Sequence, residues 1–469
     1  MFVGRVEQLE MFESAYASDN FEFIILYGQR RIGKTTLLGE FIKNKKAIFF
    51  TSKEANDAMN LKEFAATVLE YFNMSEGLSF STWQAAFEFI ANQSKDEKPI
   101  VIIDEYPYAA LANKSLNSML QIAIDHHLNK TNVKLILSGS HVSFMEKEVM
   151  GNKSPLYGRR TGALQLKPLD YFETGLMLPN YSNLDKMRFF GILGGIPYYL
   201  SLVNHSKTFE DNLIDMFFKV SGKLYDEPNF LLREEFRELA VYNSIIMAVA
   251  KGSNRPNEIQ NIAEIEPSST PFYLRQLIEI GFLRKVLPFG ENPLKSKKGI
   301  YEIADNTFRF WYEHVYPHKS TIELGFGTTV ATNKVLPLID DFIGKSVFEY
   351  VAAEYLVRAV KHGKISHIPT RLGKWWGNDP IEKKESDVDV VFESENHVIL
   401  GECKWREHFP QMQEIRKLVN KKRLFSQYES HDFYFFTKYP FEEKTIQGMG
   451  EEKLPEITVV TLEDLFDFK

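Results

Sequence analysis

The chain has 469 residues, 44% of them hydrophobic and 25% charged, as in a globular protein of roughly three domains. We expect a cytoplasmic protein without membrane contact, because the apolar runs are only strand-length and no secretory leader stands at the start. A single cysteine excludes an internal disulfide and a multi-cysteine zinc site, and the net charge of −7 argues against a dedicated nucleic-acid binder.

Four apolar runs in the first third of the chain predict a parallel β-sheet. They are "FEFIILYG", "AIFFTS", "PIVIIDE" and "VKLILSGS", and helical patterns separate them between residues 21 and 166. Near-continuous apolar strands of this kind are typical of a sheet that helices cover on both faces.

The remaining two-thirds predict smaller domains. A helical stretch is broken at "GGIPYYL", three further helical stretches precede a strand pair around "GENPLKSKKG", and the last part alternates helices and strands. Three helices followed by a strand pair are typical of a winged helix. The predicted boundaries are 1–167 for the sheet domain, 168–230 for a helical lid, 231–316 for the winged helix, 317–340 for a linker and 341–469 for a small α/β domain. The expected fold class is therefore α/β multidomain.

The sequence "YGQRRIGKTTLL" directly after the first strand fits the phosphate-binding pattern G-x-x-x-x-G-K-S/T. Glycines let backbone amides curl around phosphate oxygens, Lys34 reaches the outer phosphates, and Thr35 can ligate Mg²⁺. An ordinary glycine turn is the alternative, but the flanking strand and helix stand where the motif requires them. The residues expected to contact a nucleotide are Gly28, Gln29, Arg30, Arg31, Ile32, Gly33, Lys34, Thr35 and Thr36.

The run "PIVIIDEY" places Asp104 and Glu105 at the carboxyl end of a central strand, where ligands of open α/β sheets bind. Asp104 is expected to help hold Mg²⁺, and Glu105 to orient or deprotonate the attacking water. A simple helix cap is the alternative. Ser138 ends the next strand and is placed to sense the terminal phosphate. Arg160 in "PLYGRRTG", with its neighbour Arg159, either contacts that phosphate or lies in a solvated basic turn.

The predicted winged helix has two interpretations. Its helix in "SSTPFYLRQLIEIGFLRKV" and its wing carry polar and basic residues that would suit DNA. The residues concerned are Thr270, Tyr273, Arg275 and Gln276 on the helix and Lys295, Lys297 and Lys298 on the wing. The alternative, which the acidic surroundings favour, is that the module transmits the nucleotide state.

The stretch "DVDVVFESENHVILGECKW" predicts two adjacent strands with a charged cluster. Because side chains alternate along a strand, Glu402 and Lys404 share one face next to Asp389, and Cys403 points into the core. Oxygen ligands suit Mg²⁺ or Mn²⁺, so Asp389 and Glu402 are candidate metal ligands, and Lys404 is a candidate to position water. A half-exposed hairpin with cross-strand ion pairs is the alternative.

A basic stretch, "EIRKLVNKKRLF", follows this cluster. It is either a track for phosphates or a solvated helix face. Its basic residues are Arg416, Lys417, Lys421, Lys422 and Arg423.

The first two-thirds of the chain resemble the archaeal-type ATPases of the STAND class of AAA-like P-loop NTPases. The motifs are "FVGRVEQLE", "GQRRIGKTTL", "IVIIDEY", "LILSGS", "LYGRRTG", "GGIPYYL" and "YEIADNTFRFWY". The resemblance implies an ATPase core, a helical lid with Pro197, and a winged helix that acts as an ATP-dependent switch. It also implies that Arg5 lies near the adenine. Gln29 stands where proline is common, and Ser138 where many related ATPases have asparagine or threonine.

The last quarter resembles the PD-(D/E)xK nuclease core and the domain family DUF234. Asp389, Glu402 and Lys404 match the strand residues of the nuclease core, and Glu349 in "FIGKSVFEYVAAEYL" matches its upstream glutamate. The DUF234 likeness rests on "RLGKWWGNDPIEKKESDVDVVF" and "ILGECKW". That family usually has glutamate where Asp387 stands, which makes Asp387 a candidate accessory acid.

Two hypotheses follow. In the first, ATP binding and hydrolysis control a C-terminal, metal-dependent DNA nuclease, with Glu105, Glu349, Asp389, Glu402 and Lys404 as catalytic residues. In the second, the chain is a non-cleaving, ATP-regulated scaffold, or a DNA- or protein-binding regulator with an inactive nuclease fold. Candidate partners are ATP, DNA, a protein trigger and a second copy of the chain. The complete quartet favours the first hypothesis, and the acidic net charge favours the second.

Overall fold

The computed structural model describes residues 2–74, 78–94 and 97–468. The chain forms two compact units, one of Met1–Pro168 with Ile196–Tyr198 and one of Leu169–Gly195 with Tyr199–Lys469. Among the described residues, none of the helices combines the length and the apolar character that crossing a membrane requires.

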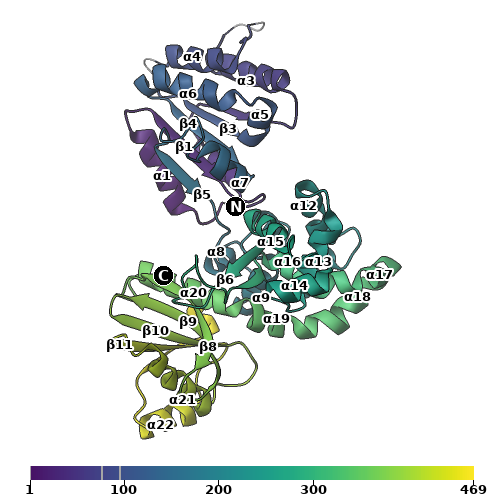
Figure 1. Ribbon diagram of the computed structural model, residues 1–469, viewed down its shortest axis with the longest axis vertical. Helices are drawn as coiled ribbons and strands as arrows, with labels where there is room; N and C mark the ends of the chain where they lie inside the picture. Colours follow the sequence, from purple (N-terminus) through teal and green to yellow (C-terminus); the bar gives the residue numbers. More distant parts are fainter. Residues whose placement is uncertain (1, 75–77, 95–96, 469) are drawn as a thin grey trace. The chain divides into compact units, whose positions relative to one another are not determined.

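The first unit is built on a five-stranded parallel sheet with the order β2-β3-β4-β1-β5 (Figure 1). Its four predicted strands are confirmed, and a fifth, β5, was not predicted because its short sequence "GALQ" has no apolar run. The strands are β1 (Glu22–Tyr27), β2 (Ala47–Thr51), β3 (Ile100–Asp104), β4 (Lys134–Gly139) and β5 (Gly162–Gln165).

Helices cover both faces of this sheet. One face packs into a core with α3, α4 and α6, in which the rings of Phe64 and Trp83 stack 5.0 Å apart. On the other side, α1 packs against α2 through the rings of Phe12 and Phe41. The helices are α1 (Val6–Ala17), α2 (Lys34–Phe41), α3 (Asp57–Tyr71), α4 (Trp83–Gln93), α5 (Tyr106–Ala112), α6 (Leu116–His126) and α7 (Val142–Phe144), with short helices η1 (Leu128–Lys130) and η2 (Met145–Val149). All residues of β3 and β4 and the four central residues of β1 are buried, which explains the near-continuous apolar sequences of these strands.

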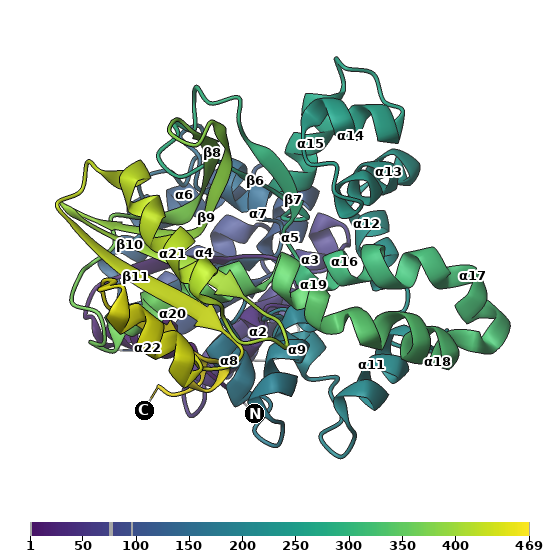
Figure 2. The same ribbon diagram turned by 90° about the horizontal axis from the view of Figure 1, so that it is seen from below.

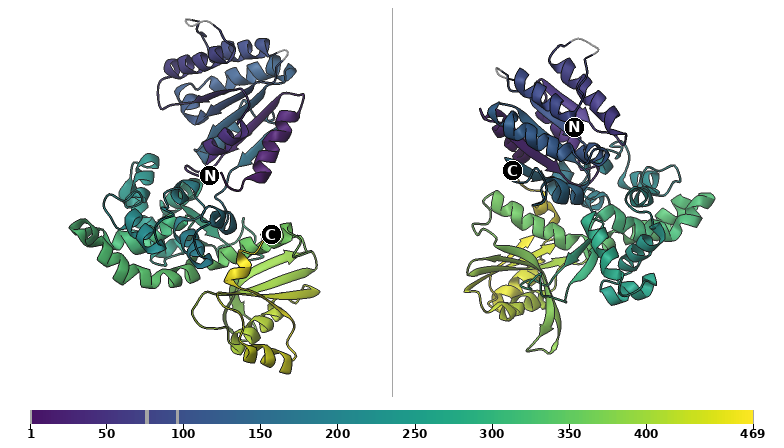
Figure 3. Two further views of the ribbon diagram at one scale, coloured as in Figure 1. Left: turned by 180° about the vertical axis from the view of Figure 1, so that it is seen from behind. Right: turned by 45° about the horizontal axis from the view of Figure 1, so that its top comes forward.

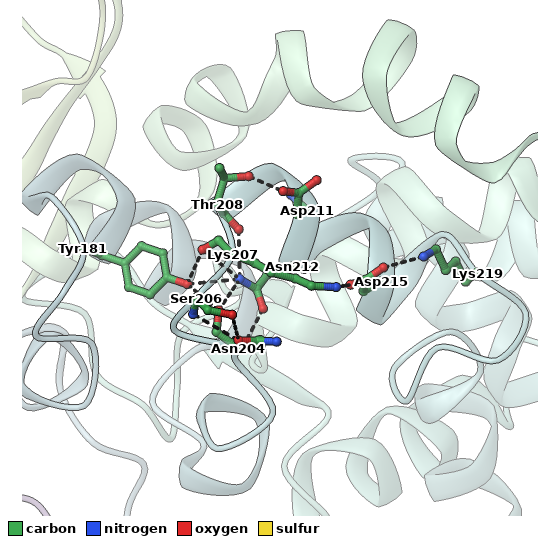
Figure 4. A network of polar contacts seen from close by, with 9 residues as sticks. All are labelled: Tyr181, Asn204, Ser206, Lys207, Thr208, Asp211, Asn212, Asp215 and Lys219. Carbon is green, nitrogen blue, oxygen red and sulfur yellow. Dashed lines mark hydrogen bonds and ion pairs between the residues drawn. The ribbon is translucent and has the colours of Figure 1, made fainter.

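The stretch predicted as the lid is helical. Its helices in the second unit are α8 (Tyr171–Leu176), α9 (Asn183–Leu193), α11 (Phe209–Phe217) and α12 (Glu227–Glu235), and α10 (Pro197–Leu200) begins in the first unit and ends in the second. The loop before α11 is held by the buried Asn212, whose side-chain amide donates to the carbonyls of Asn204 and Thr208 and to the hydroxyl of Tyr181 (Figure 4). This network is structural, because it satisfies backbone groups that the loop would otherwise leave unpaired.

Three helices and an antiparallel strand pair follow in the order that was predicted for the winged helix. They are α13 (Leu239–Ala250), α14 (Pro256–Ala263), α15 (Thr270–Glu279), β6 (Leu283–Val286) and β7 (Ile300–Ile303). Thr270, predicted to face DNA, is buried, and the hydroxyl of Tyr273 donates to Glu238. Lys298 pairs with Glu291.

The stretch predicted as a loose linker, 317–340, is helical. It turns back on itself at Gly325, where φ is +90°, before α19 (Figure 3). Ile322, Val330 and Val335 are buried, and Gly327 lies so close to the Phe218 carbonyl that a Cβ would overlap it. The elements are α16 (Asn306–Phe310), η3 (Trp311–Val315), η4 (Tyr316–His318), α17 (Lys319–Thr321), η5 (Ile322–Phe326), α18 (Gly327–Val330), η6 (Ala331–Val335), η7 (Leu336–Leu338) and α19 (Ile339–Ser346). The linker prediction was wrong because these buried apolar positions were overlooked.

The C-terminal part is a five-stranded mixed sheet with the order β12-β11-β10-β9-β8 (Figure 2). The pairs β8–β9 and β9–β10 are antiparallel, and β10–β11 and β11–β12 are parallel. Helix α20 packs on one face through Tyr355 and Phe436, and α21 on the other through Ile415 and Leu418. The elements are α20 (Phe348–Lys361), β8 (Arg371–Asp379), β9 (Lys384–Ser394), β10 (His397–Lys404), α21 (Met412–Asn420), η8 (Lys421–Phe425), β11 (Ser430–Thr437), α22 (Glu443–Glu451), β12 (Ile457–Val460) and α23 (Leu462–Leu465).

Candidate active sites

The loop between β1 and α2 has the backbone conformation that the phosphate-binding pattern requires. Gly33 is the N-cap of α2 with φ of +88°, which other residues adopt only at a cost. At Gly28 a Cβ would stand 2.4 Å from the Leu166 carbonyl oxygen, so only glycine fits there. The loop therefore ends on a helix N-terminus whose free amides favour an anion.

Lys34, Thr35 and Asp104 lie together at this end of the sheet. The buried Lys34 Nζ donates to the carbonyls of Gly28 at 3.0 Å and Gln29 at 2.9 Å. Thr35 Oγ1 donates to Asp104 Oδ2 at 2.8 Å. Burial lowers the pKa of Lys34, although Glu105 and Asp104 favour its charge. The hydroxyl and the carboxylate thus meet where they can both serve a hard cation.

Glu105 is held in a strained backbone conformation with φ of +49°, at the N-cap of α5. Such conformations cost of order 1 kcal/mol and concentrate at functional sites. Its Oε2 accepts hydrogen bonds from the Ser140 amide at 3.1 Å and the Ser140 hydroxyl at 2.7 Å. Ser140 thus fixes the carboxylate at the end of the neighbouring strand, and sequence reasoning did not identify it.

The predicted phosphate sensors differ in their surroundings. Ser138 is fully buried at the end of β4, and within the described chain its hydroxyl makes no hydrogen bond. Arg159 forms a two-pronged ion pair with Asp125 at 2.7 Å, so its role is to fix the loop. Arg160 is exposed and donates to the Met150 carbonyl at 3.4 Å.

Arg5, predicted near the adenine, and Pro197, predicted to mark the lid, both lie against the loop. Arg5 is buried and donates to the Ile32 carbonyl at 3.3 Å. Pro197 lies beside Gly33, and the Tyr198 amide donates to the Arg31 carbonyl at 3.4 Å. Arg30, another residue of the loop, donates a hydrogen bond to the Tyr108 hydroxyl at 3.1 Å.

The second cluster depends on an irregularity in β9. Val388 pairs with Trp375 and Val391 with Gly373, so β9 has one residue more than β8 between these pairs. Val388 and Val391 therefore share one core, which strict alternation would forbid. A β-bulge re-aims side chains in this way. The alternation assumed from the sequence thus fails at Asp389, whose Oδ2 accepts from the Cys403 amide at 2.8 Å.

Asp389, Glu402 and Lys404 are brought together. Lys404 Nζ is 2.5 Å from Glu402 Oε1 and 3.9 Å from Asp389 Oδ2, so a cation already lies between the two carboxylates. Burial, followed by the charges of Glu402 and Glu349, raises the pKa of Asp389 to about 7. Burial would also raise the pKa of Glu402, but Lys421 and Lys404 outweigh it and hold that pKa below its usual value.

Glu349 on α20 joins this cluster through a lysine. Lys374 on β8 is 3.0 Å from Glu349 Oε2, and its charge also interacts with Asp389. Lys421 is 2.8 Å from Glu402 Oε2. Sequence reasoning missed Lys374 altogether, because nothing in "RLGKWWG" marks it as an acid's partner.

Three other predictions about this region can be compared with the structure. Cys403 is partly buried rather than a core residue, and this burial together with the nearby carboxylates raises its pKa. Asp387 is exposed and pairs with Trp376 across the strands. Three basic residues of the predicted phosphate track form ion pairs within the chain. Arg416 pairs with Glu452, Arg423 with Asp379 and Lys421 with Glu402.

The strand pair β6–β7 is attached to the same cluster. The Phe289 amide, in the loop after β6, donates to the Lys374 carbonyl at 2.8 Å. Glu302 on β7 accepts a hydrogen bond from Tyr350, the residue next to Glu349. Arg284 on β6 lies 3.7 Å from the centre of the Tyr350 ring. The predicted wing is therefore joined to the elements that carry Glu349 and Lys374.

Residues 2–203 match a family of ATPase domains that is found predominantly in Archaea, and residues 311–418 match DUF234, a family of archaeal and bacterial proteins of unknown function. An uncharacterized protein of Methanocaldococcus jannaschii is 34% identical over 407 residues, which are 87% of this chain and 88% of the relative. The chain belongs to the archaeal ATPase family with a C-terminal DUF234 domain.

Two further proteins are similar to parts of this family member. An uncharacterized ATP-binding protein of the same organism is 50% identical over 46 residues, 10% of this chain and 78% of the relative. A Walker-type ATPase of Pyrococcus abyssi has a similar fold, with a TM-score of 0.51 and 21% identity over 66% of this chain and 96% of that chain.

The nucleotide site of this archaeal ATPase fits ATP with Mg²⁺. Thr35 and Asp104 offer oxygen ligands only 2.8 Å apart, and the loop amides and Lys34 offer positive charge. Lys34 bonds only loop carbonyls in the contacts described above, and these are weaker partners than phosphates. The protein is thus an ATPase by family and by the chemistry of its donor set.

Proposed function

We propose that the chain is an ATP-hydrolysing switch that controls a metal-dependent, DNA-cleaving site in its C-terminal domain. The observation that carries this proposal is the convergence of Glu349, Asp389, Glu402 and Lys404, which come from one helix and two strands. A surface hairpin with ordinary ion pairs would not need a carboxylate whose pKa is raised to about 7 by burial and by the charges of two other acids.

For ATP, the chain's residues supply positioning and charge. Lys34 would leave the loop carbonyls and bind the outer phosphates, Thr35 and Asp104 would hold Mg²⁺, and Glu105 would orient the water. Bound Mg²⁺ neutralises the developing charge on the phosphates. Ser140 keeps the Glu105 carboxylate directed at one point, and the unpaired hydroxyl of Ser138 is available to a phosphate oxygen.

At the second site, Asp389 and Glu402 would hold Mg²⁺ or Mn²⁺, which supplies a Lewis acid for a phosphodiester. Lys404, which lies between the two carboxylates, would then have to give up that position to the metal and remain near it. There it would position and polarise the attacking water. Lys421 and Lys374 stay on the outer carboxylate oxygens of Glu402 and Glu349 and compensate their charge.

Control would pass through the predicted winged helix. The loop after β6 bonds to the Lys374 carbonyl, and Glu302 on β7 bonds to Tyr350 beside Glu349, so a shift of β6–β7 would change the spacing of the acids. This favours the transmitting interpretation of the module over DNA reading by its wing.

The test is relaxation of supercoiled plasmid by the purified full chain with Mg²⁺ or Mn²⁺, with and without ATP. Asp389→Asn should abolish cutting because a ligand charge is lost. Lys404→Ala should reduce cutting by about 100-fold or more, a usual contribution of such a group, while metal still binds. The matched controls are Glu385→Gln and Lys384→Ala, both exposed on β9, which should cut like wild type.

Absence of cutting by wild type under every metal and nucleotide condition would contradict the nuclease proposal and support the alternative function. In that function the chain is a non-cleaving regulator, and Lys404 stays between the acids as a permanent counter-ion. Cutting that survives in Asp389→Asn would remove the cluster from the catalytic assignment.

A further inference from the structure

A second group of possible metal ligands lies at the other end of β10. His367 is in the loop between α20 and β8, His397 is the first residue of β10, and Asp432 is on β11. Their ligand atoms all lie within 4.8 Å of one another. Three segments that are distant in sequence thus bring two imidazoles and a carboxylate together.

His397 is oriented as a metal-binding histidine would be. It is only 6% exposed, and its Nδ1 lies 2.8 Å from the Ser430 hydroxyl. Metal-binding histidines commonly fix one ring nitrogen in this way, so that the other presents its lone pair.

The other ring nitrogen, Nε2, is buried and has no hydrogen-bond partner among the described residues. Asp432 Oδ2 lies 3.2 Å from this nitrogen, at ion-pair distance. A buried nitrogen without a hydrogen bond is costly unless something binds it. A metal ion held by His397, Asp432 and His367 would bind this nitrogen in place of the histidine–aspartate ion pair.

We propose that His367, His397 and Asp432 form a binding site for a divalent transition-metal ion of the Zn²⁺ class. Two imidazole nitrogens and one carboxylate are a usual protein ligand set for Zn²⁺, with water in the fourth position. The oxygen-only cluster around Asp389 suits Mg²⁺ or Mn²⁺ instead, so the two sites differ in metal preference.

Binding requires a small rearrangement. The rings of His367 and His397 stack with centroids 3.9 Å apart and an interplanar angle of 16°, which leaves their lone pairs nearly parallel. Bonds of about 2.0–2.1 Å to one tetrahedral ion need nitrogens about 3.4 Å apart with converging lone pairs. His367 is on a loop, so it is the ring that would turn.

The site would fasten the loop 362–370 to the sheet. That loop joins α20, which carries Glu349, to β8, which carries Lys374. His397 and Lys404 are seven residue steps apart on β10, about 23 Å of extended strand, so the ion would not take part in the chemistry at Asp389. Its role is structural, and the inference does not depend on the proposed nuclease.

The experiment titrates Co²⁺, as a spectroscopic substitute for Zn²⁺, into the metal-free full chain. Tetrahedral Co²⁺ with nitrogen ligands absorbs visibly, whereas octahedral Co²⁺ on oxygen ligands absorbs only weakly. Wild type should give a visible band that saturates at one ion per chain and disappears when Zn²⁺ is added. His367→Ala and Asp432→Asn should lose the band, and Ser430→Ala should weaken binding about 10- to 100-fold.

The controls are His408→Ala, an exposed histidine of another loop, and Asp389→Asn, in the other cluster. Both should keep the band. His367→Ala is the decisive variant because its side chain is on a loop, whereas a change at buried His397 risks the fold. Failure of wild type to give the band, or its survival in His367→Ala and Asp432→Asn, would overturn the proposal.

Discussion

Strain and burial mark the residues on which the chemistry at the nucleotide site depends. Glu105 combines a left-handed backbone conformation with two hydrogen bonds from Ser140, which together direct its carboxylate. Lys34 is buried with only carbonyl oxygens as described hydrogen-bond acceptors. A buried ammonium group of this kind is better stabilised by phosphate than by neutral oxygens.

Lys34→Ala should therefore abolish measurable ATP binding, because the site loses its main cation. Glu105→Gln should keep ATP binding and slow hydrolysis by about 100- to 1,000-fold, since only the water-orienting charge is lost. Fluorescent-nucleotide binding and phosphate release measure the two effects. Lys43→Ala, an exposed lysine just after α2, is the control. Equal hydrolysis by wild type and Glu105→Gln would remove Glu105 from the catalytic residues.

The nucleotide site was predictable because a contiguous motif determines it. Gly33, Lys34 and Thr35 follow one another, and the end of an apolar strand places Asp104. Ser140 and Lys374 were not predictable, since their roles arise from contacts across 35 and 25 residues of sequence. The bulge at Asp389 was missed because a period-two pattern assumes a regular strand.

Helix α20 links several parts of the second unit. Glu349 contacts Lys374, Tyr350 contacts Glu302, and Glu354 accepts a hydrogen bond from the Tyr171 amide on α8 at 3.1 Å. A single amphipathic helix thus connects the sheet, the strand pair and the first helix of the unit. The apolar face of α20 could be predicted from the sequence, whereas these polar contacts could not.

Glu354 should make the stability of this connection depend on pH. Burial, followed by the charge of Asp170, raises the pKa of Glu354 from 4.5 to about 8. At pH values between these two, Glu354 keeps a proton in the folded chain that it releases in the unfolded chain. The stabilisation from this group is therefore fully present below about pH 4.5 and is lost as the pH rises through about 8.

Glu354→Gln should remove this dependence, because the amide is always neutral and its oxygen can still accept from Tyr171. Thermal unfolding between pH 5.5 and 9 should show the midpoint of wild type falling relative to that of the variant, by at least about 2 °C. Glu429→Gln, an exposed glutamate, should behave like wild type. Parallel pH profiles for wild type and Glu354→Gln would contradict the assignment.

At the scale of the whole molecule, the chain passes between the two units more than once. It passes from the first to the second after Pro168, returns for Ile196–Tyr198, and leaves again at Tyr199. The returning segment lies on the phosphate-binding loop, where Tyr198 bonds to the Arg31 carbonyl and the Arg31 guanidinium lies 5.0 Å from the centre of the Tyr198 ring. A change of that loop on binding ATP would therefore act on residues covalently joined to the second unit at both ends.

This connection predicts that cutting by the C-terminal site depends on the nucleotide state. The cutting rate of wild type should differ several-fold between ATP and no nucleotide. Lys34→Ala should cut at the same rate with and without ATP. That rate should equal the rate of nucleotide-free wild type, because the C-terminal site of the variant is unchanged. Glu105→Gln, which is expected to bind ATP but hydrolyse it slowly, should keep the cutting rate of the ATP-bound state for longer than wild type. Plasmid relaxation time courses measure these rates, with Lys43→Ala as the control that keeps the response. An ATP response that persists in Lys34→Ala would show that the nucleotide acts elsewhere, and a nucleotide-independent rate in wild type would show that the two activities are uncoupled.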